Sequence, residues 1–298
     1  MKVYVRPQEH QSRGLARIGD AVVRYAPAGV DVVTDYAQAE LVVLHVIGRI
    51  GHVTRQIAQL TADGRRYALI QYALRSTKAR HTREWAPIWR GATAVWCSYD
   101  LVAAMDEDGF GAADIMGMPF YHAPYGADDT IFTPQASKHP RPFQVCTTGF
   151  SWMTESVREV ALASQVWGGT VFHLGPDMGR AWVTCAMNID DQTLATYYRQ
   201  CEWVSGLRRT EGFEMPAVEG LLCGARPVLF DAPHYTHWYG SLARYVPERA
   251  LRADIVTDLV RVFGSPAPKV TKAERAKAVK RFHWPTLVDQ FWRRILDA

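Results

Sequence analysis

The 298-residue sequence predicts an α/β fold with two domains, each a parallel β-sheet covered by helices. Segments typical of strands and of helices alternate through the first half, which is the order that a parallel sheet with crossover helices produces. A polar, proline-rich stretch at 132–143 then interrupts the pattern, and the same alternation restarts after it. A chain of this length can bury two separate cores.

The strands are expected at short runs rich in β-branched and aromatic residues. In the first half they fall at 2–6, 31–34, 41–47, 67–73 and 94–98, with helices at 15–26 and 52–64. In the second half strands fall at 143–149, 170–175, 202–207 and 226–231, with helices at 156–169 and 190–201 and a loop and helix at 211–224. We therefore place one domain at 1–136 and the other at 137–283. A cleft between them is expected to hold the ligand.

Composition argues against several classes of protein. No apolar run approaches the ~20 residues that span a bilayer, and the first residues lack the apolar core of a signal peptide. The five cysteines are scattered and form no CxxC pair, so neither a disulfide framework nor a zinc site is indicated. We expect a cytoplasmic protein.

Basic residues are concentrated in two stretches. Between Leu41 and Ser98, nine Arg or Lys residues are opposed only by Asp63 and Glu84, and a second basic stretch runs from 269 to 281. Such asymmetry is typical of a surface that binds a polyanion, but a single basic cluster is more often a solvated helix face.

The segment at 210–228 carries the most specific pattern, TEGFEMPAVEGLLCGARPV. Gly212 lets a ligand approach the backbone closely, and Pro216 suits the first turn of a helix. The free amides of that helix start would face an anion such as a diphosphate. Glu219, on the first turn, is a candidate to accept hydrogen bonds from ribose hydroxyls. The same pattern also fits a core helix that starts with proline and ends with glycine.

This segment resembles the E-x7-E signature of retaining GT-B-fold glycosyltransferases of the GT4-like superfamily, with Glu211 and Glu219 as its two glutamates. Other blocks resemble the family in the same order along the chain. They are SRGLAR at 12–17, APAGVDVV at 26–33, PYGADDTIFTP at 124–134, DDQTL at 190–194, YYRQC at 197–201 and FHW at 282–284. The resemblance implies two Rossmann-like domains facing across a cleft, with a C-terminal helix at 284–298 that crosses back to the first domain.

The resemblance also implies roles for individual residues. Glu211 would be the catalytic residue beside the donor sugar, and Glu219 would hold the ribose. The backbone amides around Gly212, Phe213 and Glu214 would bind the sugar and the diphosphate. The implied activity is transfer of a hexose from a nucleotide sugar, most frequently a UDP-sugar in this family, to an acceptor hydroxyl with retention. Neither a metal nor another cofactor is implied.

The expected phosphate-binding cations are missing. Family members carry an arginine just after the first strand of the second domain and a lysine a few residues later. Here Phe150 follows Gly149, and the lysine region reads Met153-Thr154-Glu155. The candidate diphosphate contacts are therefore Gly14 and Arg17 in the first domain and Thr147, Thr148, Gly149, Ser151, Arg180, Arg208 and Arg209 in the second. His45, His52 and His81 are candidates for the histidine that many members place near the sugar.

Glu214 also departs from the family pattern, because it stands where members have a glycine. We expect this change to alter the choice of sugar.

The first domain is expected to hold the acceptor. Its stretch at 78–90 combines cations that bind phosphate with rings that stack on bases. The candidate acceptor-binding residues are Arg75, Lys78, Arg80, Arg83 and Trp85. We hypothesise a hydroxymethylated pyrimidine in DNA as the acceptor, flipped out of the base stack. The alternatives are a saccharide, glycolipid or protein glycosyltransferase and, since the expected cations are missing, a non-catalytic nucleotide-sugar or nucleic-acid binding module.

Overall fold

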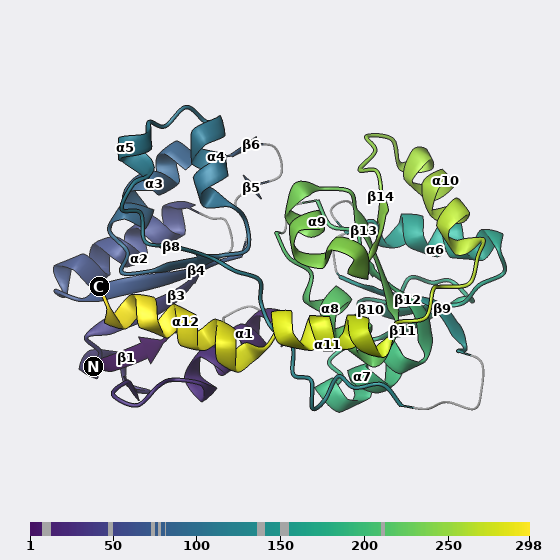
Figure 1. The fold of residues 1–298 in the computed structure, drawn as a ribbon, viewed down its shortest axis with the longest axis horizontal. Coiled ribbons are helices and arrows are strands. Elements are labelled where there is room, and N and C mark those ends of the chain that lie inside the picture. The colour runs from purple at the N-terminus through teal and green to yellow at the C-terminus, as the bar shows by residue number, and fades with distance from the viewer. Residues whose placement is uncertain are drawn as a thin grey trace. The chain divides into compact units, whose positions relative to one another are not determined.

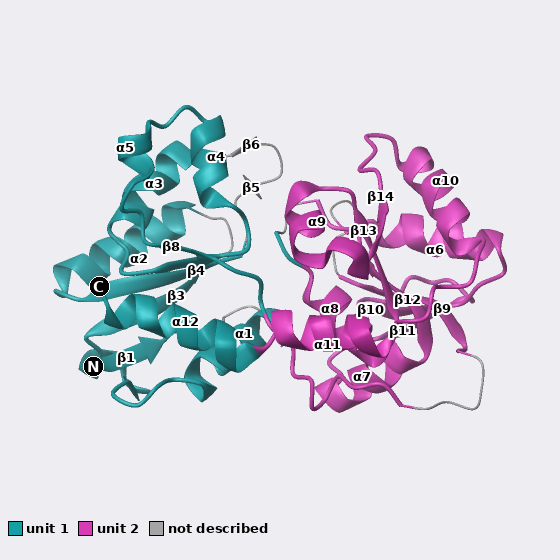
Figure 2. Ribbon diagram, in the orientation of Figure 1, with its two compact units in different colours: residues 1–125, 210–213, 284–298 teal, residues 126–209, 214–283 magenta. Residues whose placement is uncertain are grey.

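The computed structural model describes residues 1–7, 13–46, 50–72, 75–76, 79–80, 82–135, 141–149, 155–209 and 212–298, with the backbone alone at 13, 75, 76, 79 and 80. The chain divides into two compact units, coloured separately in Figure 2. Unit 1 comprises Met1–Tyr125, Thr210–Phe213 and Trp284–Ala298, and unit 2 comprises Gly126–Arg209 and Glu214–His283. Unit 2 thus begins at Gly126, earlier in the chain than residue 137, where the second domain was predicted to begin.

Unit 1 is built on a six-stranded sheet in the order β2-β1-β3-β4-β7-β8, with parallel neighbours throughout. Its strands are β1 (Lys2–Val5), β2 (Asp31–Val32), β3 (Leu41–Val46), β4 (Arg66–Gln71), β7 (Val95–Cys97) and β8 (Phe120–His122). Its helices are α1 (Arg13–Arg24), η1 (Tyr36–Gln38), α2 (Ile50–Ala62), α3 (Thr82–Arg90), α4 (Leu101–Glu107), α5 (Ala112–Ile115) and α12 (Trp284–Leu296). The strands and helices predicted in this half are confirmed. Strand β8, which is too short for a periodic signal, and the helices α3, α4 and α5 were missed.

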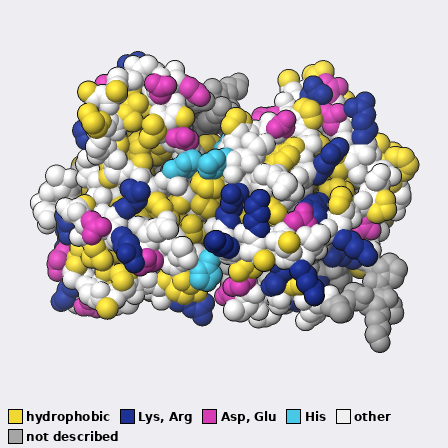
Figure 3. All heavy atoms as spheres, in the orientation of Figure 1, with side chains coloured by type: hydrophobic (Ala, Val, Ile, Leu, Met, Phe, Trp, Pro, Cys, Tyr) yellow, Lys and Arg dark blue, Asp and Glu magenta, His cyan; other side chains and the backbone are white. Residues whose placement is uncertain are grey.

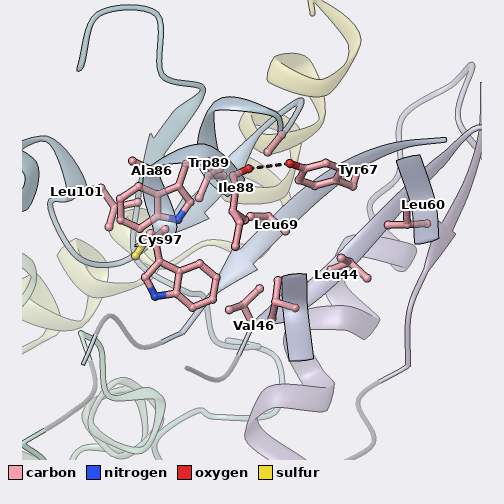
Figure 4. Packing of buried hydrophobic residues seen from close by; sticks show 14 of the residues in the cluster. Leu44, Val46, Leu60, Tyr67, Leu69, Ala86, Ile88, Trp89, Cys97 and Leu101 are labelled. Carbon is pink, nitrogen blue, oxygen red and sulfur yellow. Dashed lines mark hydrogen bonds between the residues drawn. The ribbon is translucent and has the colours of Figure 1, made fainter. Parts of the chain in front are cut away.

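Aromatic side chains fix helix α3 on this sheet (Figure 4). Trp89 is fully buried, and its indole Nε1 donates to Gln71 Oε1 of β4 at 2.6 Å. The Tyr67 hydroxyl, also on β4, donates to the Ile88 carbonyl oxygen at 2.8 Å. Because a buried indole or phenol needs a hydrogen-bond partner, these contacts specify one placement of α3 over β4.

Helix α12 returns from the end of the chain to pack in unit 1 (Figure 1). Its buried face is Trp284, Leu287, Val288, Phe291, Trp292 and Ile295, which recur at helical spacing. The Trp292 indole donates to the Val22 carbonyl oxygen of α1 at 3.0 Å, and the Tyr121 hydroxyl of β8 donates to the Leu287 carbonyl oxygen at 3.0 Å. The predicted return of the C-terminal helix to the first domain is confirmed.

Unit 2 contains a second six-stranded parallel sheet, in the order β11-β10-β9-β12-β13-β14. Its strands are β9 (Phe143–Thr148), β10 (Val171–Leu174), β11 (Val183–Ala186), β12 (Cys201–Gly206), β13 (Arg226–Phe230) and β14 (Arg244–Val246). Its helices are α6 (Val157–Val166), α7 (Asp191–Arg199), α8 (Met215–Cys223), α9 (Pro233–Tyr239), η2 (Gly240–Leu242), α10 (Arg252–Phe263) and α11 (Lys272–Arg281). The elements predicted here are confirmed, and β11, β14 and the helices from α9 onward were missed.

Local sequence signals set several of these boundaries. The Asp190 side chain caps α7 by accepting a hydrogen bond from the Thr193 amide at 2.7 Å. Pro216 lies in the first turn of α8, and Gly224 caps its end, as the sequence predicts. Among the described residues, none of the helices combines the length and apolar character needed to cross a membrane.

An ion pair between the buried Arg226 and the partly exposed Glu274 ties α11 to β13. Arg226 is 6% exposed, and its guanidinium forms two hydrogen bonds with Glu274, Nη1 to Oε1 at 2.8 Å and Nη2 to Oε2 at 3.1 Å. Glu274 also completes a capping box with Thr271 at the start of α11. Arg226 lowers the pKa of Glu274 to about 2, and the Thr271 hydrogen bonds act in the same direction.

We expect Glu274→Gln to lower the free energy of unfolding at pH 7 by about 2 kcal/mol, because a hydrogen bond between charged groups is lost while Arg226 stays buried. Urea unfolding measures the change. Asp289→Asn is the matched control, since Asp289 and Arg293 form an exposed pair at 2.8 Å, and such pairs contribute about 0–1 kcal/mol. Equal losses in the two variants would contradict the assignment.

Candidate functional site

The order of strands in unit 2 creates a switch point beside its first strand, β9. Strand β10 pairs with one edge of β9 and β12 with the other, so the chain leaves β9 and β12 in opposite lateral directions. In open parallel sheets, ligands bind outside the carboxyl ends of the strands at such a point. Thr148 and Gly149 lie at the end of β9, and Arg208 follows the end of β12.

The Arg208 guanidinium joins the segments that meet there. Its Nη2 donates to the Thr148 hydroxyl at 2.8 Å. Its Nη1 pairs with Glu155 Oε1 at 3.1 Å, and its Nε lies 3.1 Å from Glu214 Oε2. Of the predicted donor-binding residues, Gly149, Arg208 and Glu214 are therefore brought together.

Two tyrosines of α9 support the start of α8. Glu214, the N-cap residue of α8, is fully buried, and its Oε1 lies 3.4 Å from the Tyr235 hydroxyl. The Tyr239 hydroxyl donates to the Glu214 carbonyl oxygen at 2.5 Å. Burial, together with the nearby Glu214 carboxylate, raises the pKa of Tyr239 well above its usual value. Tyr239 therefore stays a neutral hydrogen-bond donor across the physiological range.

Glu219, the predicted ribose ligand, is buried on the first turns of α8. It is 1% exposed, and its Oε2 accepts a hydrogen bond from the Tyr198 hydroxyl of α7 at 3.2 Å. Contact with a ribose requires neighbouring side chains to move. The ribose role of Glu219 stays a prediction.

Other candidate cations of unit 2 have separate partners. Arg209 pairs with Glu248 at 3.0 Å and lies over the Phe230 ring at 5.1 Å. Arg180 is exposed and lies over the Trp182 ring at 5.8 Å. Neither arginine takes part in the cluster that Arg208 forms with Thr148, Glu155 and Glu214.

Four of the donor-binding candidates, Gly14, Arg17, Gly212 and Phe213, belong to unit 1. Gly14 and Arg17 lie in the first turns of α1. A Cβ at Gly212 would lie 2.7 Å from both Ser98 Oγ and Tyr99 Cδ2, so local packing alone requires a glycine there. The Phe213 ring packs edge-on against Tyr125 at 5.8 Å. The contacts of these four residues with a donor stay predictions.

Several predicted residues lie outside the described part of the chain. These are the catalytic candidate Glu211, Ser151, the acceptor candidate Lys78, and His81. Arg75 and Arg80 pair through their backbones in the short antiparallel ribbon β5 (Arg75–Ser76) and β6 (Ala79–Arg80), and their side chains are not described. Their roles stay predictions.

The prediction that Trp85 stacks on an acceptor base is wrong. Trp85 is 1% exposed and stacks on Trp89 in the core of unit 1, with ring centroids 6.3 Å apart. Trp85, Ile88 and Trp89 have helical i, i+3, i+4 spacing, which directs them to the sheet. Arg83 is exposed on the same helix and donates to the Asp108 carbonyl oxygen at 3.0 Å.

Basic side chains lie at many points of the face in view, and some of them adjoin one another (Figure 3). Figure 3 shows Lys and Arg interspersed with acidic and uncharged side chains. Most basic residues of α11 are exposed, while Arg275 donates to the Leu222 carbonyl oxygen at 3.3 Å. The stretch at 269–281 thus matches a solvated helix face. Among the described residues, no group of three or more His, Cys, Asp or Glu is arranged to hold a metal ion.

The sequence did not predict that Glu155 would contact Arg208, or that two tyrosines of α9 would contact Glu214. Glu155 was noted only as the absence of a lysine, although its carboxylate contacts Arg208. Tyr235 and Tyr239 lie in a segment without a recognisable motif, and only the order of β12, β13 and α9 brings them to Glu214.

Comparison with known proteins identifies the fold through solved structures. No family model matches the chain, and no curated protein does. Among solved structures, sucrose-phosphate synthase from Thermosynechococcus elongatus matches with a TM-score of 0.72 at 14% identity, over 99% of each chain. Anabaena HepE in complex with UDP-glucose matches with a TM-score of 0.69 at 13% identity, over 100% of this chain and 99% of that one. AviGT4, a glycosyltransferase involved in avilamycin A biosynthesis, matches with a TM-score of 0.62 at 14% identity, over 100% and 98%.

The chain has the GT-B fold. The matches extend over both units, and the two parallel sheets provide the paired α/β domains that the fold requires. The fold predicted from the resemblance is confirmed.

A buried histidine makes the stability of unit 2 depend on pH. His173 of β10 is 1% exposed, and its Nδ1 lies 2.8 Å from the Thr147 hydroxyl. Burial lowers its pKa from 6.5 to about 4. Between these two pH values the unfolded chain binds a proton that the folded chain does not, so stability falls as the pH drops through this window.

His173→Gln removes this titration and retains a hydrogen-bonding side chain beside Thr147. When the pH falls from 7 to 5, we expect the unfolding free energy of the wild type to drop by about 2 kcal/mol more than that of the variant. Urea unfolding at both pH values measures the difference. An identical pH dependence in the two proteins would show that His173 is not responsible.

Proposed function

We propose that this protein is a glycosyltransferase that moves a hexose from a UDP-sugar to an acceptor hydroxyl with retention. The observation that carries the proposal is the position of Arg208, which lies with Thr148 and Glu214 at the switch point of the second sheet. The full-length likeness to HepE, whose structure is in complex with UDP-glucose, supports the same class of donor.

The arrangement suits stabilisation of a leaving diphosphate. As the bond between the sugar and the phosphate oxygen breaks, negative charge grows on that oxygen and the sugar ring becomes oxocarbenium-like. Arg208 supplies positive charge beside Thr148, and α8 begins next to it with the partial positive charge of a helix start. Because the fold already fixes both, they act without reorganisation.

Within this proposal Glu211 acts beside the donor sugar, the role that the resemblance implies. In this mechanism the departing phosphate accepts the proton of the acceptor hydroxyl, so no separate protein base is needed. Attack and departure then take place on the same face of the sugar, which retains the configuration.

Arg208→Gln is expected to lower kcat/KM for nucleotide release by roughly 100-fold, the scale of losing one preorganised electrostatic contact in a transition state. Glu211→Ala is expected to abolish turnover in a folded protein. The assay is release of nucleotide from UDP-, GDP- and ADP-sugars. Arg249→Gln is the matched control, because Arg249 pairs with Asp258 at 3.1 Å and should not affect the rate. Wild-type activity in Arg208→Gln would contradict the role of Arg208.

The proposal includes no metal or other cofactor, because the positive charge at the leaving group comes from Arg208 and the start of α8. We expect the rate of UDP release to be unchanged in EDTA. A rate that falls with the chelator and returns with added Mg²⁺ or Mn²⁺ would contradict this part of the proposal.

For the acceptor, the proposal retains a hydroxymethylated pyrimidine in DNA, supported by the basic side chains of the first domain. Without Trp85 it rests on charge alone. The release assay is therefore run with hydroxymethylated DNA, with plain DNA and without DNA. Release that requires the hydroxymethyl group supports the DNA acceptor, whereas release indifferent to DNA favours a saccharide, glycolipid or protein acceptor.

One observation favours a second candidate, a non-catalytic module that binds a nucleotide sugar or nucleic acid. Glu155 and Glu214 both pair with Arg208 and reduce the positive charge available to a phosphate. Binding of UDP-sugar or DNA without release of nucleotide from any donor would support this alternative.

A further inference from the structure

The carboxylate of Glu155 packs against the backbone of Gly149, at the carboxyl end of β9. The contact is so close that a Cβ at position 149 would clash with both carboxylate oxygens. Gly149 has a φ of 136°, in the region that favours glycine. The same carboxylate pairs with Arg208 Nη1 at 3.1 Å, and Arg208 Nη2 contacts the Thr148 hydroxyl at 2.8 Å. Thr148, Gly149 and Arg208 thus form an anion seat, and Glu155 occupies it.

The two carboxylates on Arg208 differ in their freedom to leave. Glu214 is fully buried at the start of α8, and separating it from Arg208 would leave a charge without water. The Glu155 side chain is 12% exposed, so its carboxylate can exchange Arg208 for solvent. Glu214 therefore positions the guanidinium, and Glu155 is its exchangeable partner.

We propose that Glu155 is an internal competitor for the anion seat, and that the diphosphate of a nucleotide or nucleotide sugar binds there by displacing the Glu155 carboxylate. The inference rests on the donor class proposed above and adds a residue that sets the affinity for it. A phosphoryl group has the charge and the acceptor oxygens to take over the contact of Arg208 Nη1 and to accept a hydrogen bond from the neighbouring Thr148 hydroxyl. Gly149 gives it the room that the carboxylate now uses.

The competition has a consequence for ligand choice. Displacing Glu155 costs the same for every ligand whose diphosphate enters the anion seat. Inorganic pyrophosphate has no base or ribose whose contacts offset this cost, whereas UDP has both. Free pyrophosphate is therefore bound weakly by the wild-type protein.

Calorimetric titration of the full-length chain with UDP and with inorganic pyrophosphate tests the proposal. Glu155→Gln keeps the shape of the side chain and removes its charge, and it is expected to bind both probes roughly tenfold more tightly, equivalent to about 1.4 kcal/mol. Glu155→Ala is expected to show the same gain. In the Arg208→Gln background the added Glu155→Gln change is expected to give no gain, because the competition is for Arg208.

Glu248→Gln is the matched control, since it removes a carboxylate that pairs with the neighbouring Arg209 at 3.0 Å. Its affinity for both probes should equal that of the wild type. If the wild type binds UDP but neither Glu155 variant binds more tightly, the competitor role is wrong and the proposed function stands. A gain that persists without Arg208 also overturns it. If neither the wild type nor Glu155→Gln binds UDP or pyrophosphate, the proposed function and this inference both fail.

Discussion

The guanidinium of Arg208 is the group on which the arrangement of the candidate site depends. A charge in a poorly hydrated position is unfavourable unless it is paired, and the buried carboxylate of Glu214 has the same requirement. At 3.1 Å the two opposite charges pair, which fixes the end of β12 against the start of α8. The Tyr235 hydroxyl lies 3.1 Å from the Arg208 carbonyl oxygen, so α9 is held at the same point. The scaffold is thus organised for an anion before a ligand arrives.

Local signals explain how much of the fold was predictable. Runs of β-branched residues mark buried parallel strands, and the proline and glycine that bound α8 act within a single turn. Elements without such signals were missed, as with the three-residue strands β8 and β14. Trp85 shows a different failure: its basic neighbours suggested a surface, but its spacing with Ile88 and Trp89 already indicated a core face.

The candidate site was less predictable because its contacts join segments that are distant in sequence. A resemblance can align Gly149, Arg208 and Glu214 with family positions, but it cannot tell which side chain compensates for a missing cation. That depends on strand order, since β9 and β12 are neighbours only in the folded sheet. Glu155 was readable as a departure from the family pattern, while its pairing with Arg208 was not.

The pairing also explains how a carboxylate can stand at a site proposed for phosphate. In the free protein Glu155 neutralises part of the charge on Arg208, so the unliganded site does not hold an unpaired cation. An incoming diphosphate offers more charge and more acceptor oxygens than one carboxylate, while the displaced Glu155 regains water. The exchange replaces one anion by another without changing the position of Arg208, because Glu214 holds its other edge throughout. An acidic residue beside the proposed phosphate site is therefore compatible with donor binding, at the cost of affinity.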